Sequence, residues 1–179
     1  MDFSVVIPTY NGAERLPKVL DCLQAQEVPP DLQWEIIIVD NNSRDETAAI
    51  VEQYQSTWNI DVPLRYVFEP LQGAAFARQT GIRQAHRELV GFLDDDNLPA
   101  TNWVAEAVEF GQQNPKVGAF GGKTEIPIRP TSKSEYQWIL FIYSAPQGKY
   151  SILKFAPYFC LKNRRNIRGN CYIQRFSLW

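Results

Sequence analysis

Short apolar runs alternate with helical patterns along the chain, and this alternation constrains the fold more than any other feature. The runs are nearly continuous in apolar residues, as is typical of strands buried on both faces of a parallel sheet. They span residues 3–8, 34–40, 64–68 and 89–94. The helical patterns between them are marked by Leu16, Val19, Leu20 and Leu23, by Thr47, Ile50, Val51 and Tyr54, and by an Ala-rich segment at 73–86. The order predicts an α/β fold with an open, mostly parallel sheet flanked by helices.

Weaker patterns follow the fourth apolar run. Thr101 is placed to cap a further helix, and "VGAFGG" at 117–122 indicates another strand. An amphipathic helix is expected at 136–143, where Tyr136, Ile139, Leu140 and Tyr143 follow helical spacing. A Pro-containing stretch at 126–134 is the nearest feature to a boundary. We therefore expect two parts within one globular domain, residues 1–127 and residues 128–179.

Composition narrows the class of protein. The chain has 179 residues, of which 45% are hydrophobic and 21% charged, which excludes a disordered or fibrous chain. Its cysteines are Cys22, Cys160 and Cys171, without the spacing of a disulfide framework or zinc site. The start "MDFSVVIPTY" lacks the basic residues of a signal peptide, and no apolar run reaches the length of a membrane span. A cytoplasmic location is expected.

Charge is divided unevenly between the two parts. Residues 128–179 carry nine basic residues and one acidic residue, Glu135, whereas the rest of the chain has a net charge of −10. The basic part is also aromatic, so it is suited to peripheral contact with an anionic membrane surface or to binding a large acceptor. Binding of nucleic acid through this part is the alternative, but the acidic remainder would repel phosphates. We expect no nucleic-acid partner.

Three adjacent acids, in "GFLDDDNLPA" at 91–100, follow the last of the four apolar runs. In an extended segment, the side chains of Asp94 and Asp96 point to one face and that of Asp95 to the other. Two carboxylates on one face suit a hard divalent cation such as Mg²⁺ or Mn²⁺. The alternative is a solvated acidic turn. The carboxyl ends of parallel strands meet at one edge, where the segments 8–11, 40–47 and 69–70 are also polar, and this favours a ligand site.

Several other kinds of site are excluded or disfavoured. The chain has no G-x-G-x-x-G, Walker or G-x-S-x-G motif, which argues against ordinary dinucleotide-binding proteins, P-loop enzymes and serine hydrolases. A nucleotidyltransferase is disfavoured because its glycine-rich N-terminal loop is missing. The single histidine, His86, is expected to be a structural or surface residue, and Asp45 to cap the helix that carries Thr47.

The segments "VVIPTYNGAERLPKVLDCLQAQ", "EIIIVDNNSRDET", "GAAFARQTGIRQA" and "LVGFLDDDNLP" together resemble the nucleotide-sugar-binding half of family 2 glycosyltransferases. The resemblance covers residues 3 to about 127 and implies a GT-A-type, Rossmann-like fold. It also implies metal-dependent transfer of a sugar, usually with inversion, in polysaccharide or glycoconjugate synthesis. The implied donor is a nucleoside-diphosphate sugar, most often a uridine diphosphate sugar, and the implied acceptor is a saccharide or is lipid-linked.

Specific residue roles follow from the same resemblance. Pro8, Thr9 and Tyr10 would line the nucleoside pocket, and Asp40 would bind the base. Arg78 would lie near the nucleotide, with Gln79 departing from the family's usual Asn. Asp94 would lie near ribose and metal, Asp95 would bind substrate, and Asp96 would ligate Mn²⁺ or Mg²⁺. The alternatives are a turn cap for Asp40, beside Asn41 and Asn42, and a surface ion pair for Arg78.

The resemblance does not identify a general base. Related enzymes usually supply it after a segment similar to "IRGNCYIQRFSLW", and this sequence ends there, as a truncated chain would. Glu125, Glu135 and Asp95 do not match the expected position, so the base is expected to be absent from this chain. The alternative function is therefore a catalytically incomplete remnant that binds nucleotide sugars, with an incomplete acceptor-binding region at 128–179.

Overall fold

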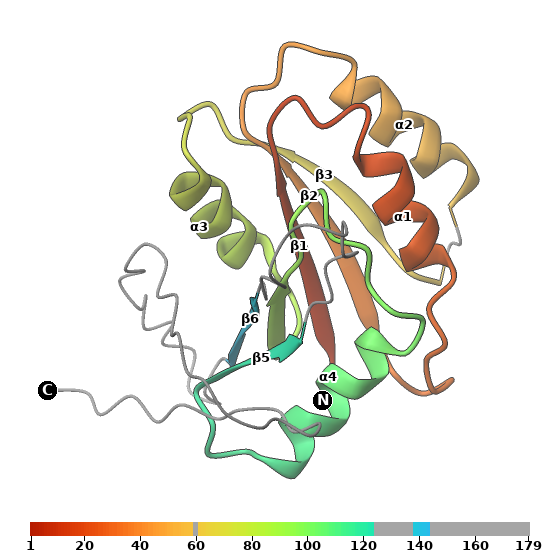
Figure 1. Ribbon diagram of the computed structural model, residues 1–179, viewed down its shortest axis with the longest axis vertical. Helices are drawn as coiled ribbons and strands as arrows, with labels where there is room; N and C mark the ends of the chain where they lie inside the picture. The colour runs from red at the N-terminus through yellow and green to blue at the C-terminus, as the bar shows by residue number, and fades with distance from the viewer. Residues whose placement is uncertain (59–60, 124–137, 144–179) are drawn as a thin grey trace, which may run out of the picture.

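The computed structural model describes residues 1–58, 61–123 and 138–143, which form one sheet and four helices in these ranges. In chain order the elements are β1 (Phe3–Thr9), α1 (Leu16–Gln24), β2 (Trp34–Asp40), α2 (Thr47–Thr57), β3 (Leu64–Phe68), α3 (Ala74–Gln84), β4 (Leu89–Phe92), α4 (Trp103–Gln113), β5 (Ala119–Lys123) and β6 (Trp138–Tyr143). The strand order is β3-β2-β1-β4-β6-β5 (Figure 1). The first four of these strands are parallel, as predicted, and the α/β fold class is confirmed.

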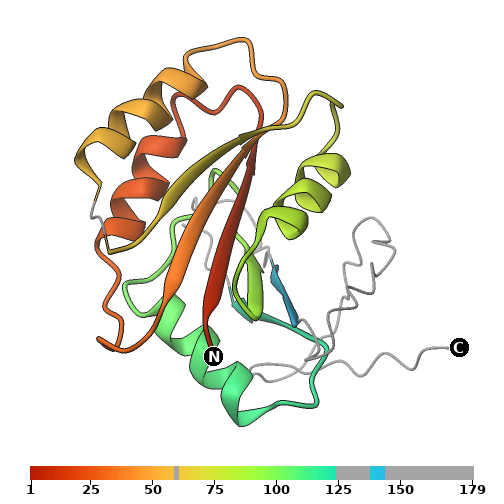
Figure 2. The ribbon, with the colours of Figure 1, turned by 180° about the vertical axis from the view of Figure 1, so that it is seen from behind.

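Helices cover both faces of the parallel part of the sheet (Figures 1 and 2). Val5 and Ile7 of β1 point to the face covered by α1, α2 and α4, while Val6 points to the face covered by α3. On the α3 face, the backbone of Gly81 lies so close to β1 that a Cβ there would come within 2.2 Å of Val6. This tight packing holds the C-terminal half of α3 against β1.

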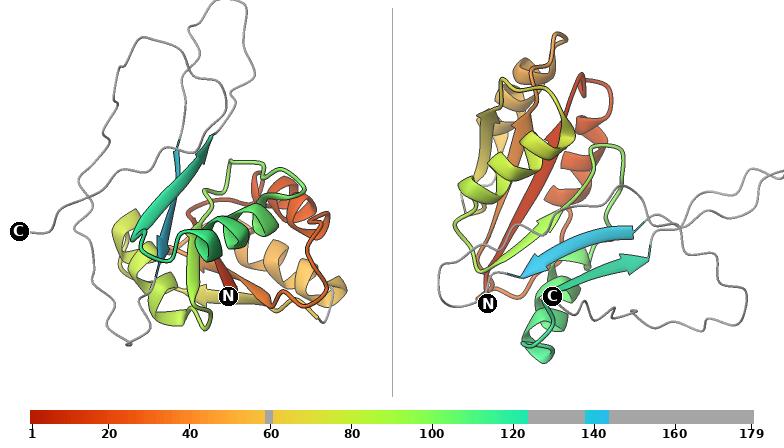
Figure 3. Two further views of the ribbon diagram at one scale, coloured as in Figure 1. Left: turned by 90° about the horizontal axis from the view of Figure 1, so that it is seen from below. Right: turned by 90° about the vertical axis from the view of Figure 1, so that its left-hand side faces the viewer.

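The last two strands extend the sheet beyond β4 (Figure 3). β6 pairs antiparallel with β4, with Gly91 opposite Phe141, and β5 pairs antiparallel with β6. The strand expected at 117–122 is thus confirmed as β5. The prediction of a helix at 136–143 is wrong, because Trp138–Tyr143 is a strand. Short apolar runs rich in aromatic and β-branched residues fit a buried strand as well as a helix, and pairing with β4 decides between them.

Two local predictions are also corrected. The fourth strand ends at Phe92, so the three acids lie in a turn rather than in extended backbone, where the Asn97 N–H donates to the Asp94 carbonyl at 3.1 Å. The N-cap of α4 is Asn102, not Thr101, and it makes no capping hydrogen bond through its side chain. Gln26 supplies that cap from the loop after α1, since its Oε1 accepts from the Val104 N–H at 3.0 Å.

Several predictions concern parts of the chain outside the described residues. These include Glu125, Glu135 and most of the basic, aromatic segment at 128–179, and the division at residue 127 stays a prediction. Among the helices that the structure describes, none is long and apolar enough to cross a membrane.

Candidate functional site

A cavity of about 370 Å³ opens at the carboxyl ends of β1, β2 and β4, beside the start of α3. It is lined by Pro8, Thr9, Tyr10, Arg15, Asn41, Ala74, Ala77, Arg78, Asp94, Asp95 and Asp96. The lining comes from the ends of strands, the loops that follow them and the first half of α3, at the edge where open α/β sheets bind ligands. The structure therefore brings together seven of the eight predicted site residues, all except Asp40.

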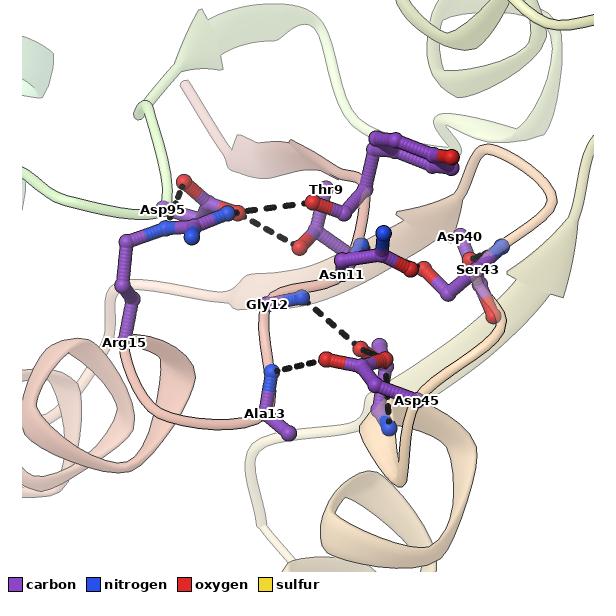
Figure 4. Close-up of polar contacts among 11 residues, drawn as sticks. Thr9, Asn11, Gly12, Ala13, Arg15, Asp40, Ser43, Asp45 and Asp95 are labelled. Carbon is purple, nitrogen blue, oxygen red and sulfur yellow. Dashed lines mark hydrogen bonds and ion pairs between the residues drawn. The ribbon is translucent and has the colours of Figure 1, made fainter.

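Several hydrogen bonds join the loop after β1 to the loop after β2 (Figure 4). The Asn11 N–H donates to Ser43 Oγ at 2.9 Å, and the Arg44 N–H donates to Asn11 Oδ1 at 2.9 Å. Asn11 has φ of 49°, a left-handed conformation that asparagine tolerates better than most residues. Further along, the Gly12 N–H donates to Thr47 Oγ1 at 2.8 Å. These bonds fix the backbone that carries Thr9 and Tyr10.

Asp45 also joins these two loops. Its Oδ1 accepts from the Thr47 N–H at 3.1 Å, but the N-cap of α2 is Glu46, so the prediction of Asp45 as the cap is wrong by one residue. Its Oδ2 accepts from the Ala13 N–H at 3.1 Å. Burial would raise the pKa of Asp45, but these hydrogen bonds, together with that from the Thr47 hydroxyl, hold it below its usual value. The carboxylate therefore joins two loops of the site while it stays ionised.

Asp40 lies at the end of β2 and is almost fully buried. Its Oδ1 accepts from the Ser43 N–H at 2.9 Å, and its Oδ2 accepts from the Tyr66 hydroxyl at 2.6 Å (Figure 4 shows Asp40 beside Ser43). Burial, followed by the hydrogen bond to Asp40, raises the pKa of Tyr66. These contacts match the alternative of a turn cap. Binding of a base by Asp40 stays a prediction, since Asp40 is absent from the cavity lining.

Asn41 connects the site to the loop after β3. Its Nδ2 donates to the carbonyl oxygens of Glu69 and Leu71, and its Oδ1 accepts from the Gly73 N–H at 2.6 Å. Gly73 precedes α3 and has φ of 143°, a conformation that favours glycine. Through these bonds Asn41 fixes the beginning of α3, and with it the position of Arg78.

The three acids of the turn after β4 have different surroundings. Asp94 Oδ1 accepts from Arg78 Nη2 at 2.9 Å, which is the ion pair expected as the alternative for Arg78, but within the cavity. Asp95 accepts from the Thr9 hydroxyl at 2.5 Å and from Arg15 at 3.0 and 2.8 Å. Asp96 is exposed and makes no hydrogen bond or ion pair with another residue in the described part of the chain.

The charges of the cavity suit a cation that arrives with an anionic ligand. Two arginines, Arg15 and Arg78, partly balance the three aspartates, so that one negative charge remains. The described residues contain no cluster of three or more acidic, His or Cys side chains that could hold a metal alone. Mg²⁺ commonly takes one or two carboxylates and completes its coordination with water and phosphate oxygens. Asp94 and Asp96 fit that arrangement together with a diphosphate.

Sequence reasoning missed four residues of the cavity lining, Arg15, Asn41, Ala74 and Ala77, and also Tyr66, which contacts Asp40. Arg15 offered one signal, because a basic residue is unusual where a helix begins. Asn41 stood beside the predicted Asp40 without a role of its own. Tyr66 lies inside a strand, and only the pairing of β3 with β2 places its hydroxyl at Asp40. His86 is confirmed as a surface residue, since 65% of its side chain is exposed beside Glu35 and Arg65.

Comparison with known proteins agrees with this geometry. The model of the Glycosyl transferase family 2 family matches residues 4–175. The chain is 35% identical over 106 residues to glycosyltransferase AglE of Haloferax volcanii, covering 59% of this chain and 34% of that protein. It is 32% identical over 110 residues to the poly(ribitol-phosphate) beta-N-acetylglucosaminyltransferase TarS of Staphylococcus aureus, covering 62% and 19%. The chain belongs to glycosyltransferase family 2.

Solved structures support the same family and fold. The structure of S. aureus TarS residues 1–349 in complex with UDP-GlcNAc has a TM-score of 0.62 and 26% identity, covering 74% of this chain and 37% of that one. The mannosyltransferase PcManGT from Pyrobaculum calidifontis, in complex with GDP-Man and Mn²⁺, has a TM-score of 0.60 and 36% identity, covering 65% and 34%. The chain spans about a third or less of the length of these relatives, so the activity of the whole protein, its donor and its acceptor are proposals.

Proposed function

We propose that this protein transfers a sugar from a nucleoside-diphosphate sugar to an acceptor in polysaccharide or glycoconjugate synthesis, with a divalent cation and with inversion at the anomeric carbon. The observation that carries the proposal is the cavity in which three aspartates and two arginines meet at the carboxyl edge of the sheet. Such a mixture of charges offers carboxylates to a cation and guanidinium groups to a diphosphate.

The nucleoside is proposed to lie between the loop after β1 and the start of α3. Pro8, Thr9 and Tyr10 supply one wall, and Ala74 and Ala77 supply an opposite wall without bulky side chains. The Tyr10 side chain is 42% exposed, which leaves its ring accessible for stacking on a base. Asp40 is proposed to bind the base from below, because an ionised carboxylate accepts hydrogen bonds from ring N–H groups.

The diphosphate is proposed to lie over the turn after β4. Arg78 would exchange its bond to Asp94 for phosphate oxygens, and Asp94 and Asp96 would ligate Mn²⁺ or Mg²⁺, with Asp95 holding the substrate-binding turn. When bound, the cation neutralises charge on the leaving diphosphate as a Lewis acid. The chain's own residues hold the donor so that its anomeric carbon, which becomes cationic during transfer, faces the acceptor.

Related structures support the proposed class of donor, and the acceptor is proposed from the sequence. Two related structures are complexes with UDP-GlcNAc and with GDP-Man, which supports a nucleotide sugar as donor, and a uridine diphosphate sugar is proposed. Residues 1–127 are proposed as the donor half and residues 128–179 as part of an acceptor-binding region. The basic and aromatic character of that region supports a saccharide or lipid-linked acceptor and peripheral contact at the cytoplasmic face of a membrane.

Thermal unfolding with a panel of nucleotides tests the proposal. A ligand that binds the folded chain raises the midpoint of unfolding by mass action. We expect UDP to raise the midpoint in the presence of Mn²⁺ and much less with a chelator, and uridine to have little effect in either. Equal midpoints with UDP, GDP and ADP, with and without Mn²⁺, would contradict nucleotide-sugar binding. Release of UDP from a bound UDP-sugar would then distinguish an active enzyme from a binding remnant.

A further inference from the structure

Arg15 occupies a position where arginine does not favour helix formation. It is the N-cap residue of α1, and no side chain caps this helix end. Ser, Thr, Asp and Asn are preferred at an N-cap because their side chains accept hydrogen bonds from the free N–H groups. Arginine has no acceptor, and its charge lies unfavourably at the positive end of the helix dipole. The residue at this position therefore has a use other than starting the helix.

The side chain of Arg15 is held at three points. Its Nε donates to Asp95 Oδ1 at 3.0 Å, and its Nη2 donates to Asp95 Oδ2 at 2.8 Å and to the Tyr10 carbonyl at 3.1 Å. Two parallel bonds from one guanidinium to one carboxylate fix orientation as well as distance (Figure 4). The hydrogen bond to Asp95 also raises the pKa of Arg15 above its usual value.

Asp95 is the acid that attaches the turn to the loop after β1. Its side chain is 13% exposed, compared with 42% for Asp94, and it also accepts from the Thr9 hydroxyl at 2.5 Å. The backbone of the turn has its own bond from the Asn97 N–H to the Asp94 carbonyl, which closes the turn without orienting it toward β1. Asp95 with Arg15 and Thr9 thus determines where the neighbouring carboxylates point.

We infer that Arg15 is a positioning residue for the diphosphate and cation, and that it acts through Asp95. By holding both oxygens of Asp95, it keeps the middle acid turned toward the loop after β1, and it leaves Asp94 and Asp96 to face the ligand. It also neutralises the charge of Asp95, which would otherwise repel phosphate. This role rests on the proposed function, because it presupposes that the cavity binds a diphosphate.

The variant Arg15→Asn separates this role from a merely structural one. Asparagine is a favourable N-cap residue and offsets the loss of the partly exposed pair with Asp95, so the midpoint of thermal unfolding should stay close to that of the wild type. We expect the dissociation constant for UDP with Mn²⁺, measured by calorimetry, to rise about tenfold, the lower end of the effect of losing a residue that orients metal ligands. Binding of uridine, measured by saturation-transfer NMR, should not change, because it contains no phosphate.

Two further variants serve as controls. Arg15→Lys keeps the charge but loses the paired bonds, so its affinity for UDP should lie between those of the wild type and Arg15→Asn. Lys18→Gln removes the same charge from an exposed position in α1, outside the cavity lining, and should bind UDP as the wild type does.

The outcomes separate this inference from the proposed function. If wild-type protein binds UDP with Mn²⁺ and Arg15→Asn binds it within about twofold, the positioning role is overturned and the proposed function stands. If Arg15→Asn loses affinity for UDP and for uridine equally and also has a lower unfolding midpoint, Arg15 has a structural role and the inference is overturned. If the wild type binds no UDP with Mn²⁺, the proposed function fails, and the role of Arg15 fails with it.

Discussion

Arg78 of α3 and Asp94 of the turn after β4 form an ion pair of 2.9 Å inside the cavity. Both side chains are partly exposed, by 31% and 42%, and an ion pair of this kind contributes little stability. It can therefore be exchanged for stronger partners at small cost. Phosphate oxygens are such a partner for Arg78, and a divalent cation is such a partner for Asp94. The pair thus indicates where the diphosphate and the cation are expected to meet.

Arg78→Gln should weaken binding of UDP in the presence of Mn²⁺. A hydrogen bond to a charged group contributes about 1.5–3 kcal/mol, so the dissociation constant should rise roughly tenfold to a hundredfold. The stability of the chain should change little because the pair is partly exposed. Calorimetric titration with UDP checks the first expectation, and urea unfolding checks the second. The control is Arg83→Gln, which makes the same charge change in an exposed residue of the same helix and should bind UDP as the wild type does. An equal loss of UDP affinity in both variants would contradict a specific role for Arg78.

Gly12→Ala should disturb both the fold and the site. A Cβ at residue 12 would lie 2.0 Å from Thr9 Oγ1 and 3.0 Å from Asp95 Oδ2, so the Thr9 side chain must move and its bond to Asp95 must break. Overpacking of this kind costs about 1–3 kcal/mol. We expect a lower urea midpoint together with weaker UDP binding. At Gly118 an added Cβ meets nothing within 4 Å, so Gly118→Ala should unfold close to wild type. Wild-type stability of Gly12→Ala would show that the loop after β1 is not packed as described.

Glu35 gives the stability of the chain an acid dependence that is separate from the cavity. Burial would raise its pKa, but hydrogen bonds from the His86 N–H, Ser4 and Arg65 outweigh burial and hold the pKa below its usual value of 4.5. A lowered pKa in the folded state means that the carboxylate stabilises the fold above pH 4.5 and loses this effect as the pH falls through the folded value.

Glu35→Gln should therefore be less stable than the wild type at pH 7, and the difference should shrink as the pH falls below 4.5. Loss of hydrogen bonds to a buried charged group costs about 1.5–3 kcal/mol, and the partial exposure of Arg65 favours the lower end. Urea unfolding between neutral and acidic pH measures the difference directly. A difference in stability that stays constant over this range would contradict the lowered pKa. Binding of UDP at pH 7 should not change, since Glu35 lies at the opposite end of β2 from the cavity.

The parallel part of the fold could be predicted from sequence because its strands are buried on both faces. Residues such as Val5, Val6 and Ile7 must all be apolar in that environment, and a run of this kind has few other interpretations. Trp138–Tyr143 is equally apolar but followed no helix–strand alternation, so its spacing was compatible with a helix. The cap of α4 was missed for a different reason. Gln26 supplies it from a distant loop, and local sequence carries no sign of that contact.

The candidate site was predictable as far as it depends on strand ends. Thr9 ends β1, and Asp94 and Asp96 lie shortly after β4, so the parallel topology alone brings them to one edge. Their individual roles depend on contacts between loops. Side-chain alternation separates Asp95 from Asp94 and Asp96 in the sequence, but only the structure shows the two bonds from Arg15 that hold it. Asp40 is predicted to bind the base, but the sequence does not show that the Ser43 N–H and the Tyr66 hydroxyl donate to its two carboxylate oxygens.

Calorimetric titration of UDP into wild-type protein and Asp96→Ala, with Mn²⁺ and with a chelator, tests the central claim most directly. Asp96 is the acid of the turn without a partner among the described residues, so its removal should disturb the fold least while removing a proposed metal ligand. Asp31→Ala, which removes an exposed acid outside the cavity lining, is the matched control. The account predicts binding of UDP that requires both Mn²⁺ and Asp96 and is kept in the control. Binding that is equally strong with chelator or without Asp96 would contradict a metal-dependent donor site in this cavity.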